Sequence, residues 1–350
     1  MVTKFKSNIH FSCEIAELLQ KEAVQIAIGG GVQAIGSREK AKNAARKIIG
    51  LLDSSQKEEI QRFINRDTCL MVFTGLYDRN IDGSKTAPPD ELPSLKELET
   101  DLECIKLGAS NQILLEMVNQ FAFAYDIDNY GKIMRLVGNF KGGGVNKLST
   151  EKAENVDKSS HSGIALSAHT EAPYHCISTV EAGHSPAPSS LILTARWNPL
   201  SEPTTVIPIS SILNKLNFEE VLALSTRNFD FTRSETFTEG KGSGGQNVSI
   251  LEVDKNGRIG MKYNSYRFTA NDKAPEFVKK TLEKFNELIQ EAYQDKIDLQ
   301  PSVSIIINNT LALHCRDIIQ DNRRLLVRLF GYRNDIDYIS LQNDPPLVKG

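Results

Sequence analysis

The chain divides into two stretches in which apolar residues repeat with different periods. In residues 12–65 apolar side chains such as Ile15 and Leu19 recur every three to four positions, and this spacing predicts helices. The same spacing predicts a helix over residues 109–125. The glycine-rich G-G-G-V-Q-A-I-G-S-R at 29–38 lacks the lysine of a phosphate-binding loop, and no strand leads into it, so we interpret it as a tight turn.

From about residue 132 the pattern changes to short apolar runs of strand length that are separated by turn signals. Many short strands of this kind are typical of a sandwich or barrel, so the fold class is expected to be mainly β with flanking helices. One long helix interrupts the strands over residues 272–294, where a continuous apolar face indicates a brace packed on the sheet. The predicted strands include 189–197, 204–209, 247–253 and 258–263.

Two segments far apart in the chain carry residues that suit a metal site. The strand within S-G-I-A-L-S-A-H-T-E alternates up to its histidine, so His169 and Glu171 should project to the same face. The apolar run S-I-I-I-N-N-T-L-A-L-H ends at His314, which offers a third ligand. Two histidines and one carboxylate, with other positions left open, suit non-haem Fe(II) oxygenases.

The strand that follows His314 places charged residues on an otherwise apolar side. In R-R-L-L-V-R-L-F the alternation puts Arg324, Leu326, Arg328 and Phe330 on one face. Arginines are almost never buried without a partner, so these two predict an anion close by.

Composition and charge exclude several classes of function. The 350 residues carry a formal net charge of -3, which argues against a nucleic-acid partner because phosphate binding needs concentrated Lys and Arg. Five scattered cysteines without C-x-x-C spacing indicate neither a disulfide scaffold nor a structural zinc site. No apolar run has membrane-spanning length and the first residues lack the apolar core of a signal peptide, so we expect a cytoplasmic protein without a membrane partner.

These residues together resemble the Fe(II)- and 2-oxoglutarate-dependent oxygenases of the clavaminate synthase-like and taurine dioxygenase-like group. That family carries H-x-(D/E) on one strand, a distal histidine more than a hundred residues later, and an arginine shortly after it. Here the pattern is His169-Thr170-Glu171, His314 and Arg328, and the resemblance spans roughly residues 130–335. The chain departs from the family where H-C-R replaces H-G-R and where Asn308-Asn309 replaces D-N.

The resemblance implies a double-stranded β-helix, a cupin-like jelly roll with the metal inside its mouth. It implies a single oxygenase domain over residues 1–350, with a largely helical part at 1–130 and a jelly-roll core at 131–340 that includes the bracing helix. Iron(II) is the implied cofactor, and 2-oxoglutarate and O2 are the implied cosubstrates.

By the same resemblance, His169, Glu171 and His314 would hold Fe(II). Arg328 would bind the far carboxylate of 2-oxoglutarate, since a planar guanidinium grips a carboxylate through two parallel hydrogen bonds. Thr205 fits the assisting hydroxyl of the family better than Thr204.

The best analogy for the substrate is the subgroup that hydroxylates free amino acids. Arginine-hydroxylating members carry an acidic pair on the strand that here reads K-Y-N-S-Y-R at 262–267, so a guanidinium substrate is disfavoured. Because Glu171 is present, halogenation is also disfavoured. Candidate polar contacts to the substrate are Asn139, Ser160, Ser162 and Arg333.

Several alternatives stay open at this point. The same chemistry also leads to desaturation, epoxidation or cyclisation, and the substrate is either free or tethered to a carrier protein. A homodimer is compatible with the sequence. Two more remote readings are a zinc hydrolase that uses the same three ligands and an inactive jelly-roll binding module.

Overall fold

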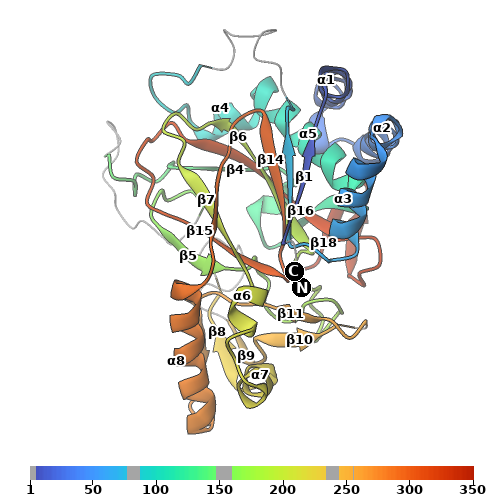
Figure 1. Ribbon diagram of the computed structural model, residues 1–350. Helices are drawn as coiled ribbons and strands as arrows, with labels where there is room; N and C mark the ends of the chain where they lie inside the picture. Colours follow the sequence, from blue (N-terminus) through green and yellow to red (C-terminus); the bar gives the residue numbers. More distant parts are fainter. Residues whose placement is uncertain (1–4, 77–86, 147–159, 234–243, 255) are drawn as a thin grey trace.

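The computed structural model describes residues 5–76, 87–146, 160–233, 244–254 and 256–350. Within these residues, helices cover one face of a large β-sheet, and a smaller sheet packs against its opposite face (Figure 1). A further group of helices and short strands packs on the outer side of the smaller sheet.

The large sheet draws its strands from both ends and the middle of the chain. Its order in the described residues is β1-β2-β14-β6-β16-β3-β18-β17, and β4 pairs with β16 beyond the end of β3. The central strands are buried on both faces, which explains their nearly continuous apolar sequences. The strands are β1 (Lys6–His10), β2 (Leu70–Thr74), β3 (Gln120–Tyr125), β4 (Arg135–Gly138), β6 (Ser190–Trp197), β14 (Val303–Asn308), β16 (Leu325–Arg333), β17 (Ser340–Asn343) and β18 (Pro346–Val348).

The small sheet has the order β13-β7-β15-β5 in the described residues. One buried cluster contains side chains of both sheets, such as Leu193 and Ile305 from the large sheet and Val206 and Ala312 from the small one. The two sheets therefore face each other across a shared core. The strands are β5 (Leu166–His169), β7 (Pro203–Pro208), β13 (Asp295–Asp298) and β15 (Ala312–Arg316).

Helices of the amino-terminal part cover the outer face of the large sheet. Helix α5 is buried on almost every side, because it lies between α1 and α2 and the strands β3, β6 and β16. Side-chain caps begin several of these helices, and Ser12 accepts a hydrogen bond from the amide of Ile15 at the start of α1. The helices are α1 (Cys13–Ile28), α2 (Ser37–Leu51), α3 (Ser54–Ile64), α4 (Leu95–Glu99) and α5 (Leu102–Met117).

The bracing helix α8 (Glu276–Glu291) lies where the sequence predicts it. Its apolar face, including Phe285 and Ile289, belongs to one cluster with Ile207 and Leu313 of the small sheet. The neighbouring elements are α6 (Ser210–Leu213), α7 (Phe218–Ser225), β8 (Phe229–Phe231), β9 (Gly245–Val248), β10 (Leu251–Val253), β11 (Ile259–Met261) and β12 (Phe268–Ala270).

Two expectations about the elements need correction. The helix predicted over 109–125 ends at Met117, because Asn119 adopts a positive φ of 58° and residues 120–125 form strand β3. The largely helical part at 1–130 therefore also supplies three strands of the large sheet. The run 247–253 is divided between β9 and β10, which belong to different sheets.

The glycine-rich stretch between α1 and α2 is a turn, as predicted. It contains a short 3-10 helix, η1 (Gly31–Gln33), and Gly30 adopts a φ of 102°, which a residue with a side chain rarely tolerates. A second 3-10 helix, η2 (Asn129–Gly131), follows β3. Among the described helices, none is both long and apolar enough to cross a bilayer.

Candidate metal centre and pocket

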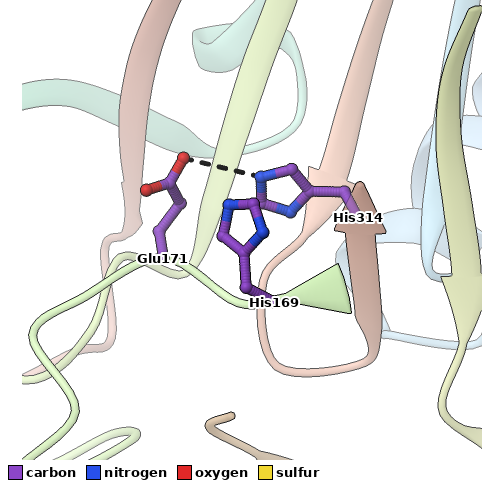
Figure 2. Close-up of side chains that lie close together, drawn as sticks. All are labelled: His169, Glu171 and His314. Carbon is purple, nitrogen blue, oxygen red and sulfur yellow. Dashed lines mark ion pairs between the residues drawn. The ribbon is translucent and has the colours of Figure 1, made fainter. Parts of the chain in front are cut away.

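Three side chains converge between the two sheets (Figure 2). His169 ends β5 and lies directly opposite His314 of β15 in the antiparallel register, with their ring centroids 4.2 Å apart. Glu171 follows β5, and its Oε1 lies 3.6 Å from Nε2 of His314. One nitrogen or oxygen from each residue can be chosen so that all three lie within 4.8 Å of one another.

Backbone hydrogen bonds fix the turn that carries the carboxylate. The amide of Thr170 donates to the carbonyl of Tyr263 at 2.7 Å, and the Thr170 hydroxyl accepts from the amide of Tyr263 at 3.0 Å. Asn309 accepts from the amide of Glu171 at 2.7 Å and donates to the carbonyl of Glu171 at 3.3 Å. The position of Glu171 is therefore set by two separate segments of the chain.

Both histidines suit metal ligands. Nδ1 of His169 lies 2.6 Å from the carbonyl of Ser167, so this nitrogen carries the proton and Nε2 is left with a lone pair. Burial, aided by the neighbouring His314 ring, lowers the pKa of His169 to about 3. The imidazole is therefore neutral, which is the form that binds metals.

The carboxylate of Glu171 is ionised. Burial alone would raise the pKa of Glu171, but the Arg328 charge and the hydrogen bond from His314 outweigh it and hold this pKa well below its usual range. Nη1 of Arg328 donates to Oε1 of Glu171 at 3.0 Å, and Nη2 donates to Asp128 at 3.1 Å. Arg328 thus joins the metal candidate to a second buried acid.

These three residues fit a divalent first-row metal. Two imidazoles and one carboxylate form the donor set, and Nδ1 of His314 is buried without a hydrogen-bond partner among the described residues. Three protein ligands on one side leave open positions toward the pocket, as in non-haem iron sites and in catalytic zinc sites. The donor set by itself accommodates either metal.

The pocket beside this cluster has an apolar body and a strongly charged lining. Leucines of the large sheet, with Val137 and Phe330, form much of its wall. Its polar lining includes Ser160, Ser167, Thr204 and Asn264. The charged lining residues in the described part consist of two acids and five arginines, namely Asp128, Glu171, Arg135, Arg267, Arg316, Arg324 and Arg328.

Arg316 and Arg324 are buried without an acidic partner among the described residues. Arg316 donates to the carbonyl of Ile164 at 2.8 Å, and Arg324 has one long contact, 3.4 Å, to the hydroxyl of Thr204. Nε and Nη1 of both guanidiniums lack a partner. Burial lowers the pKa of Arg316 to about 9 and that of Arg324 to about 10, so both stay charged at neutral pH. The carboxylate of Glu202 acts on both guanidiniums, and that of Asp298 acts on Arg324, from beyond ion-pair distance. The unpartnered N–H groups of two charged guanidiniums in one pocket suit an anionic ligand.

Arg135 lies on β4, directly opposite Arg328 of β16. Its Nη1 is hydrogen-bonded to Asp128, and its Nε donates to the hydroxyl of Ser160 at 2.8 Å. Asp128 therefore accepts from two guanidiniums at once, those of Arg135 and Arg328.

The register of β7 and β15 decides between the two threonines. Val206 lies opposite His314, and Thr205 lies opposite Cys315. Because side chains alternate along a strand, Thr204 shares the face of Val206 and His314. Thr204 accordingly lines the pocket, and Thr205, which the sequence favours, is not among the lining residues.

Of the four candidate substrate contacts, only Ser160 lines the pocket. Asn139 is buried and donates to Asn322 at 2.6 Å, and Ser162 is fully buried as well. Arg333 is paired with Asp335 at 2.9 Å near the end of β16. The predicted roles of Asn139, Ser162 and Arg333 in substrate binding are therefore not supported by their positions.

Four charged residues of the pocket were not predicted from the sequence, namely Asp128, Arg135, Arg267 and Arg316. Asp128 lies near the end of the predicted helical part and Arg135 at the start of the predicted strands, and no motif singles out either residue. Arg316 was identifiable, because it follows His314 by two positions on the same strand face.

No family model matches the chain, and no curated protein matches it. Solved structures, in contrast, do match the chain. A crystal structure of asparagine oxygenase in complex with Fe(II), 2S,3S-3-hydroxyasparagine and succinate superposes with a TM-score of 0.70, at 17% identity over 93% of each chain. The non-haem iron oxygenase OrfP with Fe, succinate and (3S)-hydroxy-L-Arg gives a TM-score of 0.68, at 16% identity over 92% of this chain and 93% of that one.

A further structure of OrfP, with Fe and alpha-ketoglutaric acid, matches with a TM-score of 0.67 at 16% identity, covering 93% of this chain and 94% of that one. At such identities the likeness shows a common fold. The chain thus has the fold of non-haem iron oxygenases, the class that its sequence resembles.

Proposed function

We propose that this protein is an Fe(II)- and 2-oxoglutarate-dependent dioxygenase that hydroxylates a C–H bond of a small polar molecule, most simply a free amino acid or a compound derived from one. The observation that carries the proposal is the cluster of His169, Glu171 and His314, which lines a pocket that Arg316 and Arg324 also line. The structural neighbours include asparagine oxygenase, with its hydroxyasparagine product, and OrfP.

The proposed architecture is a double-stranded β-helix. Support comes from the facing pair of sheets, the shared core between them, and the placement of the cluster between the sheets. In this proposal one domain extends over the chain, and β1, β2 and β3 widen the large sheet of the jelly roll.

His169, Glu171 and His314 would hold the iron, and 2-oxoglutarate and O2 would supply the oxidising chemistry there. The residues around them position and shield the site. Asn309 fixes the backbone of Glu171, and Arg328 fixes its carboxylate. The apolar wall of the pocket limits the access of water to the reacting bond.

The far carboxylate of 2-oxoglutarate has two possible partners in the pocket. The sequence resemblance points to Arg328, but this guanidinium already donates to Asp128 and Glu171. Arg324 and Arg316 form no ion pair among the described residues and keep N–H groups without a partner, and Thr204 presents a hydroxyl beside Arg324. We therefore assign the cosubstrate carboxylate to Arg324, Arg316 and Thr204, and we assign Arg328 the task of orienting Glu171.

The proposal is tested by adding Fe(II) and 2-oxoglutarate without oxygen and recording the weak visible metal-to-ligand charge-transfer band. We expect the band in the wild type, and we expect Arg324→Gln to weaken 2-oxoglutarate binding by about tenfold or more, because a charged hydrogen bond is lost. Arg333→Gln, which changes an arginine outside the pocket, is the matched control.

Arg324 is fully buried, so its replacement by glutamine is accompanied by a second variant, Thr204→Val, which keeps the shape of the side chain and removes only the hydroxyl. It should weaken 2-oxoglutarate binding severalfold. If the folded, metal-loaded wild type shows no band, 2-oxoglutarate is not the cosubstrate. If Arg328→Gln weakens 2-oxoglutarate binding while Arg324→Gln and Thr204→Val do not, the assignment to Arg324 is wrong.

A zinc hydrolase is the second candidate, because the donor set also fits zinc. In a zinc hydrolase the buried Arg316 and Arg324 would have no role in the reaction. Product analysis separates the remaining outcomes of oxygenase chemistry, since hydroxylation adds one oxygen to the substrate and desaturation removes two hydrogens.

A further inference from the structure

The end of the strand that carries His169 is paired on both sides. On one side His169 lies opposite His314 of β15, and on the other side it forms an isolated β-bridge with Asn264. Beside this bridge the amide of Thr170 donates to the carbonyl of Tyr263 at 2.7 Å. The segment between β11 and β12 therefore adjoins the metal candidate on the side away from β15.

The regular strand pairing ends at Thr170, because β5 ends at His169 and the next residue, Glu171, approaches His314. The amide of Tyr263 still needs an acceptor, since Tyr263 is fully buried and an unpaired buried amide is costly. The hydroxyl of Thr170 accepts from this amide at 3.0 Å and donates to the carbonyl of Tyr263 at 3.4 Å. One fully buried threonine thus bonds both polar backbone groups of Tyr263.

The side chain of Tyr263 is fixed at its far end by the bracing helix. Its phenol donates to Oδ1 of Asn286 of α8 at 2.6 Å. Its ring packs against Phe285 of the same helix, with the ring centroids 5.1 Å apart. Among the described residues that line the pocket, none belongs to α8. The helix is therefore connected to the residue between two metal ligands from outside the pocket.

We propose that Thr170, Tyr263 and Asn286 form a clamp that positions the metal ligands. Thr170 lies between His169 and Glu171, so a shift of its backbone changes the separation and the direction of both donor groups. Residues that orient ligands in this way contribute to metal affinity without being ligands themselves. This inference rests on the proposed metal site and extends it to a residue of α8.

The first test changes the hydroxyl of Thr170. Thr170→Val keeps the shape of the side chain and leaves the amide of Tyr263 without its acceptor. Its affinity for Co(II), measured by equilibrium competition with a chelator, should fall by about tenfold or more. The visible absorption of bound Co(II) should change as well, since it depends on the geometry of the ligands. Thr170→Ser, which keeps the hydroxyl, should bind Co(II) like the wild type.

Thr281→Val is the matched control for Thr170→Val. Thr281 is a buried threonine of α8, and its hydroxyl donates to the carbonyl of Phe277 within the same helix at 2.8 Å. The variant loses a buried hydroxyl outside the clamp, so its affinity for Co(II) should stay at the wild-type value. Urea denaturation of the metal-free variants separates a loss of stability from a loss of affinity.

The second test acts on the far end of the clamp and does not depend on the folding of Thr170→Val. Tyr263→Phe and Asn286→Ala each remove the hydrogen bond between the phenol and the helix, and each should lower the affinity for Co(II) by about threefold. The double variant should lose no more than either single variant, because both substitutions remove the same hydrogen bond.

The outcomes separate the clamp from the proposed metal site. If the folded wild type binds neither Co(II) nor Fe(II), the proposed metal site fails and the clamp fails with it. If the wild type binds metal, the clamp alone is overturned by any of three results: folded Thr170→Val binds Co(II) like the wild type, Thr281→Val loses the same affinity, or the effects of Tyr263→Phe and Asn286→Ala add up in the double variant.

Discussion

Asn309 offers a sharp test of how the site is positioned, because it touches the proposed metal ligand only through the backbone. Its side chain accepts from the amide of Glu171 at 2.7 Å and donates to two carbonyls, those of Glu171 at 3.3 Å and Pro188 at 3.0 Å. Asn309→Ala removes all three hydrogen bonds. At about 1 kcal/mol for each net hydrogen bond, the free energy of unfolding should fall by about 3 kcal/mol.

Asn309→Ala should also lower the affinity for the metal. When groups that orient a metal ligand are removed, affinity typically falls by about tenfold to hundredfold, and we expect Asn309→Ala to lose Fe(II) or Co(II) affinity in that range. Equilibrium competition with a chelator measures the affinity, and urea denaturation of the metal-free protein measures the stability.

Asn308→Ala is the matched control for this variant. Asn308 is buried next to Asn309, and within the described part of the chain its side chain accepts hydrogen bonds from the amide and hydroxyl of Thr310, at 3.1 and 2.9 Å, and from no other group. Asn308→Ala should therefore destabilise the fold to a similar degree without lowering the affinity for the metal. The reasoning is refuted if Asn309→Ala binds metal like the wild type, or if Asn308→Ala loses the same affinity.

Three further predictions concern charge and packing. Arg328→Gln removes the charge that keeps the pKa of Glu171 low, so half-occupancy by Co(II) should move to higher pH; an unchanged pH profile would contradict this role. Burial, aided by Arg135, lowers the pKa of His161 to about 4, so the unfolded chain binds more protons and stability should fall by up to about 3 kcal/mol as pH drops from 6.5 to 4. His161→Gln, measured by urea denaturation across that range, should flatten this slope, and an equally steep slope would exclude His161 as its source. Phe285→Ala should cost about 3–5 kcal/mol of stability, because the ring is fully buried between α8 and its neighbours; calorimetry that finds less than 1 kcal/mol would contradict the packing.

The sequence predicted the parts of the site that depend on local pattern. His169 and Glu171 follow from strand alternation over a few residues, and His314 ends an apolar run that the structure divides between the buried strands β14 and β15. The structure brings the three together because β5 pairs with β15, a contact between segments separated by more than a hundred residues. The family resemblance, rather than the pattern, linked the two segments.

The parts that were missed depend on register and on distant pairing. Whether Thr204 or Thr205 faces the pocket is decided by which residue of β7 lies opposite His314, and a shift of one residue exchanges them. Arg135 reaches the pocket because β4 pairs with β16, and Asp128 lies just after β3, which also pairs with β16. The spacing of residues within a strand does not predict which other strand it pairs with. The strand at 120–125 was read as helix because its aromatic residues continue the apolar run of α5.

The central claim is that His169, Glu171 and His314 hold an iron that consumes 2-oxoglutarate. The most direct measurement is the formation of succinate from 2-oxoglutarate in air, with Fe(II) supplied, by wild type and by His169→Ala and Glu171→Ala. The account predicts succinate from the wild type and a loss of at least about hundredfold in both variants, while Arg333→Gln keeps the wild-type rate. Turnover that persists in folded His169→Ala or Glu171→Ala would contradict the account.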